Sequence, residues 1–531
     1  MKKLYFLSVF AIMLASCSGK QSNETSAEFP NDPFRPQIHF SPKEAWMNDP
    51  NGMVYYDGEY HLFYQYYPDS TVWGPMHWGH AVSPDMVHWE HLPIALYPDD
   101  LGYIFSGSAI VDWDNTSGLQ DGEHPPMIAI FTHHEPKGAS EEGNITYQYQ
   151  SIAYSNDKGR TWTKYEGNPV VPNPGIKDFR DPKVSWHEAT QQWVMIFAAA
   201  DRVRIYNSPN LIDWEYQSEF GADMGGHGGV WECPDLFELP VEGTDESKWV
   251  MLLSINPGGP NGGSATQYFV GDFDGKTFIP SQKDTLWIDY GRDNYAGVTW
   301  SDIPKEDGRR LFLGWMSNWD YAQVVPTKKW RSAMTIPRSL HLTKSAETGV
   351  YSLASRPVKE LESIEEEDNG IIFLGPVDGL DAGFTESLID YEDGNETISI
   401  PFRTEITIGL SDETTNNFKI TFDNTETLEE LVLRFEDGVL SADRSKSGLT
   451  NFANNFAKQE TRVPIQELLA REELKLELFI DSSSIEVFLN DGAVVMTQII
   501  FPTQGYTRAY ISSDENPLRV SFVTTQLKSI W

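Results

Sequence analysis

Four segments of this chain repeat one short pattern, in which polar turn residues lead into an aromatic side chain. They are Ser83–Trp89, Ser155–Trp162, Ser208–Trp214 and Gly271–Phe278. The Asp, Asn and Gly residues in these segments favour the tight turns that close β-hairpins. A chain in which such turns recur at wide intervals is built from repeated β units, so we look first for a repeat architecture.

Short runs rich in β-branched and aromatic residues precede these turns, as expected for strands. The runs are Met53–Tyr56, Tyr60–Tyr66, Met127–Thr132, Trp193–Ala198, Trp249–Ile255 and Gln267–Val270. Amphipathic helical periods are scarce, and repeated units of four short strands are typical of a β-propeller. A fifth unit without the turn pattern fits the segment from Val298 to Leu342. We therefore predict an all-β chain with a five-bladed β-propeller over residues 36–350; the alternative is a set of unrelated turns in another all-β fold.

The composition and the hydrophobic pattern of the sequence change after residue 350. Of the 17 Trp residues, 16 lie between Trp46 and Trp330, and the last is Trp531. The charge run Glu360–Asp368 predicts a solvated linker over residues 351–370. Beyond it, runs of alternating apolar and polar residues predict a two-sheet β-sandwich over residues 371–531, without a catalytic cluster. These runs are Leu431–Phe435, Leu474–Ile480, Ser484–Leu489 and Val494–Ile500.

The N-terminus has the features of a secretory signal. Lys2 and Lys3 precede the apolar run Leu4–Leu14, which is too short to span a bilayer. The sequence Leu14-Ala-Ser-Cys17 resembles a bacterial lipobox, which implies a signal peptide of residues 1–16 and lipidation of Cys17. Residues 17–35 then form a flexible tether. We expect a protein anchored by lipid in the bacterial cell envelope, in the periplasm or on the cell surface; the alternative is an ordinary secreted protein with a chance cysteine.

The charge balance excludes one class of partner. The chain has 40 basic and 78 acidic residues and a formal net charge of −38. Binding to phosphate backbones needs clustered Lys and Arg, so nucleic acids are excluded as partners. Anionic membrane surfaces are disfavoured for the same reason.

Three carboxylates have unusual neighbours. Asp49 lies in Trp46–Gly52, Asp181 in Phe179–Pro182, and Glu232 in Trp231–Phe237. Each belongs to a different predicted blade, and blades converge on a central axis, so these acids can meet in one funnel. Taken singly, each has a plain structural explanation: a sharp turn at Asp49, an ion pair of Arg180 with Asp181, and apolar packing around Glu232.

Together, the three segments resemble glycoside hydrolase family 32, the β-fructofuranosidases. Further matching blocks are Phe63–Pro68, Trp73–Trp78, Phe105–Ser108, Leu313–Trp319 and Ser484–Phe488. The resemblance covers residues 36–531, and the family fold is a five-bladed propeller followed by a β-sandwich. It implies that Asp49 is the nucleophile, Glu232 the general acid/base and Asp181 a transition-state stabiliser.

The resemblance also implies a set of residues around the terminal fructose. Those expected to bind it, to orient Asp181 or to form apolar walls are Asn48, Gln65, Phe105, Ser106, Arg180, Trp73, Trp78 and Trp315. It requires no metal and no cofactor. A metal site is the rival explanation for the histidines His77, His80, His88, His91, His133 and His134, but no Cys accompanies them.

The implied reaction is hydrolysis of a fructoside with retention of configuration. Gly314–Trp319, followed by Tyr321-Ala-Gln, resembles the exo-acting inulinases and levanases. We therefore expect fructose to be released from the non-reducing ends of levan, inulin or sucrose. The alternatives are an endo-acting levanase or inulinase, a non-catalytic fructan-binding lipoprotein, and an inverting arabinan-degrading enzyme. The preferred substrate among levan, inulin and sucrose, and the oligomeric state, stay open.

Overall fold

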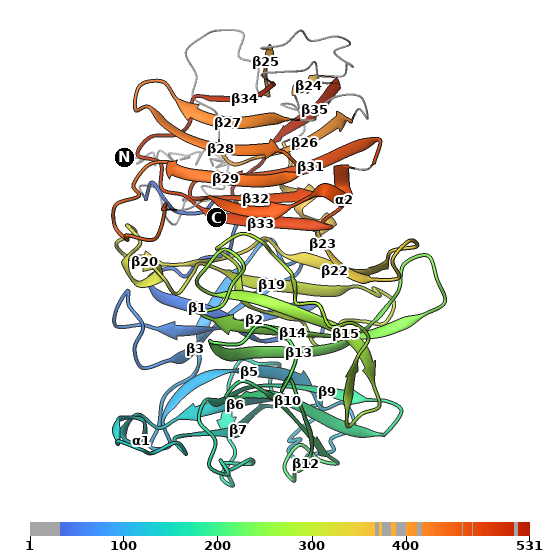
Figure 1. Ribbon diagram of the computed structural model, residues 1–531. Helices are drawn as coiled ribbons and strands as arrows, with labels where there is room; N and C mark the ends of the chain where they lie inside the picture. Colours follow the sequence, from blue (N-terminus) through green and yellow to red (C-terminus); the bar gives the residue numbers. More distant parts are fainter. Residues whose placement is uncertain are drawn as a thin grey trace, which may run out of the picture.

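The computed structural model describes residues 32–366, 371–373, 384–388, 400–410, 417–458, 460–469, 471–513 and 519–531. The predicted signal peptide and Cys17 lie outside these residues. Nearly all regular structure in the described part is β-strand (Figure 1). Its helices are all short, and none could cross a lipid bilayer.

Five sheets form the first part of the chain, each built mainly from antiparallel strands that follow one another in sequence. Blade 1 contains β1 (Ala45–Tyr56), β2 (Glu59–Tyr67), β3 (His77–Ser83) and β4 (Glu90–Leu96). Blade 2 contains β5 (Tyr103–Val111), β6 (Met127–His134), β7 (Gln148–Ser155) and β8 (Thr163–Lys164). Blade 3 contains β9 (Phe179–His187), β10 (Gln192–Ala199), β11 (Val203–Ser208) and β12 (Glu215–Phe220).

The last two blades carry extra short strands. Blade 4 contains β13 (Val230–Pro240), β14 (Ser247–Asn256), β15 (Ala265–Phe273), β16 (Phe278–Pro280) and β17 (Leu286–Trp287). Blade 5 contains β18 (Tyr295–Thr299), β19 (Arg310–Met316), β21 (Ala333–Met334), β22 (Arg338–Lys344) and β23 (Tyr351–Pro357). Short helices lie in the connections: α1 (Pro136–Ser140), η1 (Ala322–Val324) and η2 (Lys359–Ile364).

The blades close into a ring. Their first strands contact one another in the order β1, β5, β9, β13 and β18, and β18 returns to β1. β20 (Trp330–Arg331) pairs in parallel with β1 and ties the end of the propeller to its beginning. The predicted five-bladed propeller is confirmed. Its last strand extends to Pro357, past the boundary expected at residue 350, because β23 completes the fifth sheet by pairing with β22.

The four repeated turns lie at one place in their blades, between the third strand and the outermost strand. In three of them a serine hydroxyl accepts a hydrogen bond from the backbone two residues later, at Ser83, Ser155 and Ser208. The Asp or Asn at that second position accepts backbone N–H bonds in turn. The repeat therefore reflects the turn that connects the third strand to the outermost strand in the first four blades.

The second part of the chain is a β-sandwich, as predicted (Figure 1). One sheet contains β24 (Ile371–Phe373), β35 (Arg519–Gln526), β26 (Phe402–Gly409), β31 (Glu473–Asp481), β32 (Ser484–Leu489) and β33 (Val494–Ile499). The other contains β25 (Phe384–Ser387), β34 (Arg508–Ser513), β27 (Phe418–Asn424), β28 (Glu429–Glu436), β29 (Val439–Lys446) and β30 (Thr461–Pro464). A short helix, α2 (Gln466–Leu469), precedes β31. The inward-facing residues of both sheets form one continuous apolar core.

Buried charges join the sandwich to the propeller. The guanidinium of Arg338 in β22 lies 3.0 Å from Asp289 and also pairs with Glu486 in β32. Arg444 of the sandwich lies 2.6 Å from Asp293. Removing one partner of such a pair leaves an uncompensated charge and typically costs about 3–5 kcal/mol. These pairs therefore fix how the two parts meet.

His39 belongs to the same interface and predicts a loss of stability at alkaline pH. Its two ring nitrogens lie 2.7 Å from Asp481 and 2.8 Å from Glu486. Burial opposes the charged form, but the hydrogen bonds and charges of the two acids outweigh it and raise the pKa of His39 to about 9. This contribution is complete below about pH 6.5, the pKa in the unfolded chain, and disappears as pH rises through about 9.

We expect wild-type protein to lose roughly 3 kcal/mol of unfolding free energy between pH 6 and pH 9.5 from this residue. His39→Gln, which stays neutral, should be less stable at pH 6 and should lack this dependence. Urea unfolding of both proteins across this range measures the effect. Parallel pH profiles for the two proteins would contradict the assignment.

Candidate active site

All five first strands are interrupted by a β-bulge. The pairing with the second strand shifts between Met47 and Pro50, Ile104 and Gly107, and Glu232 and Asp235. The corresponding shifts in the other two blades fall between Arg180 and Lys183 and between Tyr295 and Val298. A bulge releases residues from the ladder and redirects their side chains, which is why bulges are common beside active sites. All three predicted catalytic residues lie within or at the edge of these bulges.

Local sequence explains the bulges. Pro50, Pro182 and Pro234 cannot donate a ladder hydrogen bond. In blade 2, a Cβ atom on Gly107 would lie 2.0 Å from the carbonyl oxygen of Ile130, so only glycine fits. Asp181 has a φ of 66°, in the left-handed region that non-glycine residues seldom adopt. Such strain persists where the surroundings impose it and is concentrated at functional sites.

Asp49 is held by donors from three blades. Its Oδ1 accepts a hydrogen bond from Asn48 at 3.0 Å, and its Oδ2 accepts one from Ser106 at 2.9 Å. The thiol of Cys233 lies 3.5 Å from the same Oδ2 and 3.6 Å from Oδ2 of Asp181. Burial and the nearby carboxylates raise the pKa of Cys233, so the thiol stays protonated and its single S–H can donate to either acid.

Glu232 faces the two aspartates through Arg180. The guanidinium donates to Oε1 of Glu232 at 3.0 and 3.2 Å, and its Nε lies 3.9 Å from Asp181. The hydroxyl of Tyr295 donates to Oε2 of Glu232. Three carboxylates from blades 1, 3 and 4 therefore meet at one end of the propeller axis, as the sequence predicts. Arg180 pairs with Glu232 as well as with Asp181, so it orients two of the three.

These acids line a cavity of about 340 Å³. Most residues predicted to bind substrate line it with them: Asn48, Gln65, Trp73, Phe105, Ser106 and Arg180. Trp73 lies at the mouth and is 38% exposed. The amide of Gln65 donates to the backbone of Ile104 at 3.1 Å, which fixes the side chain against blade 2.

The prediction that Trp78 and Trp315 form apolar walls of the sugar site is wrong. Trp78 and Trp315 are fully buried and do not line the cavity. Trp78 packs against Phe63 and Phe131, with its indole N–H bonded to the backbone of Phe105. Both tryptophans therefore support the site from within the blades.

The sequence reasoning missed several residues of the site. Trp319 lines the cavity, although Trp315 of the same sequence block was expected to do so, and it packs on Trp315 with ring centroids 5.0 Å apart. Tyr295 and Cys233 contact the carboxylates, as described above. Other missed lining residues are His134, Tyr147, Gln148, Asp178, Asn256 and Gln323. Among all the residues that were not predicted, Trp319 has the clearest sequence signal, because it ends a block that was already assigned to the site.

The histidines considered as metal ligands serve as hydrogen-bonding and stacking residues. His80 bonds His61, and His134 stacks on Phe105 with centroids 4.3 Å apart. His88 bonds Asp85, and His133 bonds Ser151. Within the described ranges, no three His, Cys, Asp or Glu residues are arranged to hold a metal ion.

Burial dominates the electrostatics of the aspartates. It raises the pKa of Asp49, and the charge of Glu232 raises it further. Burial, opposed by Arg180, raises the pKa of Asp181 to about 7.

This cluster predicts the acidic limb of activity. The reaction proposed below needs Asp49 ionised, so kcat/KM should fall as pH drops through a value above the ordinary aspartate pKa of about 3.9. Arg180→Gln removes the charge that opposes the rise in the pKa of Asp181. Asp181 accepts hydrogen bonds from the sugar in the same reaction, so the limb should move to still higher pH. Measuring kcat/KM for sucrose from pH 3 to 8 checks this. An acidic limb at or below the ordinary value, unmoved in Arg180→Gln, would count against it.

Comparison with known proteins agrees with this geometry. Residues 39–357 match the model of the glycosyl hydrolases family 32 N-terminal domain, and residues 387–529 match that of the family 32 C-terminal domain. The chain belongs to glycosyl hydrolase family 32. The family match spans both the propeller that carries the carboxylates and the sandwich beside it.

Individual family 32 relatives cover the chain almost completely. A levanase of Bacillus subtilis is 48% identical in an alignment of 531 positions that covers 98% of this chain and 74% of the levanase. An extracellular exo-inulinase of Aspergillus niger is 38% identical over 91% of this chain and 92% of its own length. The crystal structure of the exo-inulinase from Aspergillus awamori superposes with a TM-score of 0.83, at 35% identity over 94% of this chain and 99% of that one.

Proposed function

We propose that this protein is a retaining, exo-acting β-fructosidase that releases fructose from the non-reducing ends of fructans and from sucrose. The observation that carries the proposal is the meeting of Asp49, Asp181 and Glu232 in one cavity of a family 32 chain. The levanase and exo-inulinases among its relatives support fructans as the substrate class.

In the proposed reaction, Asp49 attacks the anomeric carbon of the terminal fructose while Glu232 donates a proton to the departing oxygen. The bond to that oxygen breaks, and a fructosyl ester forms on Asp49. Glu232, now a carboxylate, takes a proton from water, which attacks the anomeric carbon and releases Asp49. Two displacements return the original configuration, and this mechanism requires the two carboxyl groups to lie about 5–5.5 Å apart.

The remaining groups of the cavity support these steps. Asp181 accepts hydrogen bonds from sugar hydroxyls, and bonds that tighten in the transition state lower the barrier. Arg180 and Tyr295 hold Glu232, while Asn48, Ser106 and Cys233 hold Asp49. The charge that develops on the sugar then meets carboxylates that are already oriented.

The shape of the cavity supports exo action. It opens at one end of the propeller, and below the carboxylates the axis narrows to a space of about 10 Å³ between Pro50, Pro182, Pro234 and their neighbours. A sugar ring cannot pass through such a space, so the cavity ends below the carboxylates, and this shape favours the entry of a chain end.

Product analysis tests both the exo action and the retention of configuration. Timed digestion of levan and inulin should give free fructose from the first minutes, without intermediate oligosaccharides. NMR of the initial product from sucrose should show β-fructofuranose before mutarotation. Early oligosaccharides would indicate endo action, and an initial α-anomer would rule out retention. Comparing the rates on the two polymers also gives the linkage preference.

An N-terminal lipid anchor on Cys17 is the second part of the proposal. It is supported by the sequence Leu14–Cys17 after a short apolar run, and two relatives are named as extracellular enzymes. Metabolic labelling with a palmitate analogue should label the wild-type protein in the membrane fraction. Cys17→Ala should abolish the label and the membrane association; equal labelling of both proteins would disprove the anchor.

A further inference from the structure

A second and larger cavity lies at the opposite end of the propeller axis. Its volume is about 1150 Å³. The same first strands line both cavities: in β9, Asp181 belongs to the first and Lys183 to the second, and in β13, Glu232 belongs to the first and Asp235 to the second. On these two strands the second cavity begins two or three residues further along, and it opens away from the carboxylates.

Lys183 separates the two spaces. Its ammonium donates to the carbonyl of Thr299 at 2.5 Å and lies 3.2 Å from Asp235. Asp235 also accepts hydrogen bonds from the backbone and hydroxyl of Thr299, at 2.7 and 2.8 Å. All three residues are buried. Their mutual bonds form the floor of the second cavity, so this cavity is a site separate from the first.

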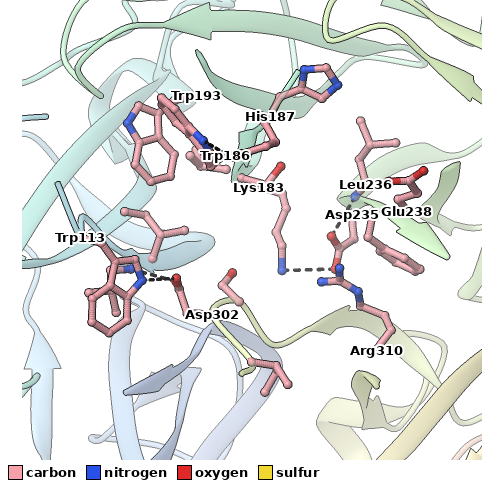
Figure 2. A pocket seen from close by; sticks show the side chains of 18 of the residues that line it. Trp113, Lys183, Trp186, His187, Trp193, Asp235, Leu236, Glu238, Asp302 and Arg310 are labelled. Atoms are coloured by element: carbon pink, nitrogen blue, oxygen red, sulfur yellow. Dashed lines mark hydrogen bonds and ion pairs between the residues drawn. The ribbon is translucent and has the colours of Figure 1, made fainter. Parts of the chain in front are cut away.

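Tryptophans form one side of this cavity. Figure 2 shows Trp113, Trp186 and Trp193 along one side, with Arg310, Asp235 and Glu238 along the other. Each indole N–H is already bonded: Trp113 to Asp302 at 2.8 Å, Trp186 to Glu188 at 2.9 Å and Trp193 to Thr116 at 2.8 Å. These bonds fix the orientation of the rings. Trp113 packs edge to face with Tyr56, with ring centroids 5.5 Å apart, but it is still 55% exposed, which is unusual for a tryptophan.

Arg310 supplies unused hydrogen-bond donors. Its guanidinium lies over the ring of Phe237, 5.0 Å from the centroid. In the part of the chain that the structure describes, no side chain forms a hydrogen bond or an ion pair with it. Guanidinium groups present five N–H donors and in proteins are normally paired. Glu238 on the same side is exposed and offers acceptor oxygens.

The lining chemistry selects a class of ligand. Acidic side chains outnumber basic ones around the cavity, which disfavours an anion. No metal-binding group occurs in the described residues. Fixed aromatic faces with both donors and acceptors beside them match a neutral, hydroxyl-rich ligand, whose C–H faces pack on indole rings and whose hydroxyls donate and accept.

We propose that this second cavity is a non-catalytic binding site for a segment of a neutral fructan chain. The inference rests on the proposed function, because it takes its ligand from the substrate class of the first cavity. A fructan is long enough to contact more than one face of a protein. Binding at a second site raises the local concentration of chain ends near the first, without contributing to cleavage of a short substrate.

Two variants on opposite sides of the cavity test the proposal. Trp113→Ala removes the exposed ring and Arg310→Gln removes the free donors; Trp113→Phe keeps a flat face. Tyr216→Ala is the matched control, since Tyr216 is an exposed aromatic residue, 44% accessible, that lines neither cavity. Each full-length protein is assayed on sucrose and on levan, and its mobility is measured in native gels that contain levan or inulin.

We expect Trp113→Ala and Arg310→Gln to keep wild-type kcat/KM on sucrose within about twofold. Their kcat/KM on levan should fall about 5- to 10-fold and their retardation in polymer gels should weaken, with Trp113→Phe between them and wild type. Wild-type retardation and levan kinetics in both variants would overturn the inference while leaving the proposed function intact. Equal losses on sucrose and levan would also overturn it, because they would show a structural role. Absence of fructan hydrolysis by the wild-type protein would instead reject the proposed function.

Discussion

Asp49→Asn is expected to lower kcat on sucrose by at least about 10⁴-fold, equivalent to ~5.5 kcal/mol of lost transition-state stabilisation. The amide has nearly the same size as the carboxylate, but it is a poor nucleophile and carries no charge to balance the developing oxocarbenium ion. Ser106 and Cys233 still find an oxygen acceptor at this position, so the fold should be retained. Steady-state kinetics, with circular dichroism as the check on folding, measure the effect.

Asp178→Asn is the matched control for Asp49→Asn. Asp178 lines the same cavity and bonds Arg180 at 2.8 Å, but it has no place in the proposed bond-making steps. Its variant should lose less than about tenfold, as expected for the loss of one orienting contact. Rapid acid quench of the wild type, followed by mass spectrometry of peptides, should find a fructosyl adduct on the peptide containing Asp49. A well-folded Asp49→Asn enzyme with a tenth or more of wild-type activity would exclude Asp49 as the nucleophile.

Glu232→Gln should lower kcat on sucrose by about 10²–10⁴-fold, the range that general acid–base catalysis contributes. Glutamine keeps the hydrogen bonds with Arg180 or Tyr295 in part but can neither give nor take a proton. A fructoside with an activated leaving group, such as fructosyl fluoride, needs no proton for the first step. The kcat/KM of the variant on this substrate should therefore fall much less than its kcat/KM on sucrose. Azide, a nucleophile that needs no base, should then attack the fructosyl-enzyme in the second step. It should restore turnover of fructosyl fluoride and give fructosyl azide of retained configuration.

The control for this experiment lies on the same strand. Glu238→Gln changes a glutamate of β13 that faces the second cavity, so its turnover of sucrose should equal that of the wild type. If Glu232→Gln lost sucrose and fructosyl fluoride activity by the same factor, and azide gave no product, then Glu232 would act by positioning and not by proton transfer.

The sequence predicted that the three carboxylates meet in one cavity, because each lies in a block with distinctive neighbours. It predicted the propeller because Ser83, Ser155 and Ser208 begin the same turn in successive blades. The indoles were harder to place. Trp73, Trp78, Trp315 and Trp319 all lie in blocks that border the site, but only Trp73 and Trp319 reach the cavity.

The two tryptophans that reach the cavity lie in loops, whereas Trp78 and Trp315 lie in β3 and β19 and are buried within the blades. The bulges of the first strands were not predicted either, although a bulge changes the direction in which side chains point. One signal for them was present in the sequence. Pro50, Pro182 and Pro234, together with Gly107 and Gly297, occur at or within the five shifts. Proline and glycine inside a strand are recognised signs of a bulge. The contact of Tyr295 with Glu232 crosses from blade 5 to blade 4, and no local pattern announces such a contact.

The closed floor of the first cavity also determines how successive turnovers are linked. Released fructose has no exit except the opening through which the polymer entered, so the shortened chain must withdraw before the product can leave. Each cleavage therefore ends in full dissociation of the chain end from the catalytic cavity, and we expect distributive rather than processive shortening. In a pulse–chase experiment, labelled levan oligosaccharides are mixed with the enzyme and then diluted with excess unlabelled chains. The labelled chains should be shortened by a single fructose and no further. Continued shortening of the labelled chains would contradict this. The catalytic cavity is therefore expected to release both products after every cleavage.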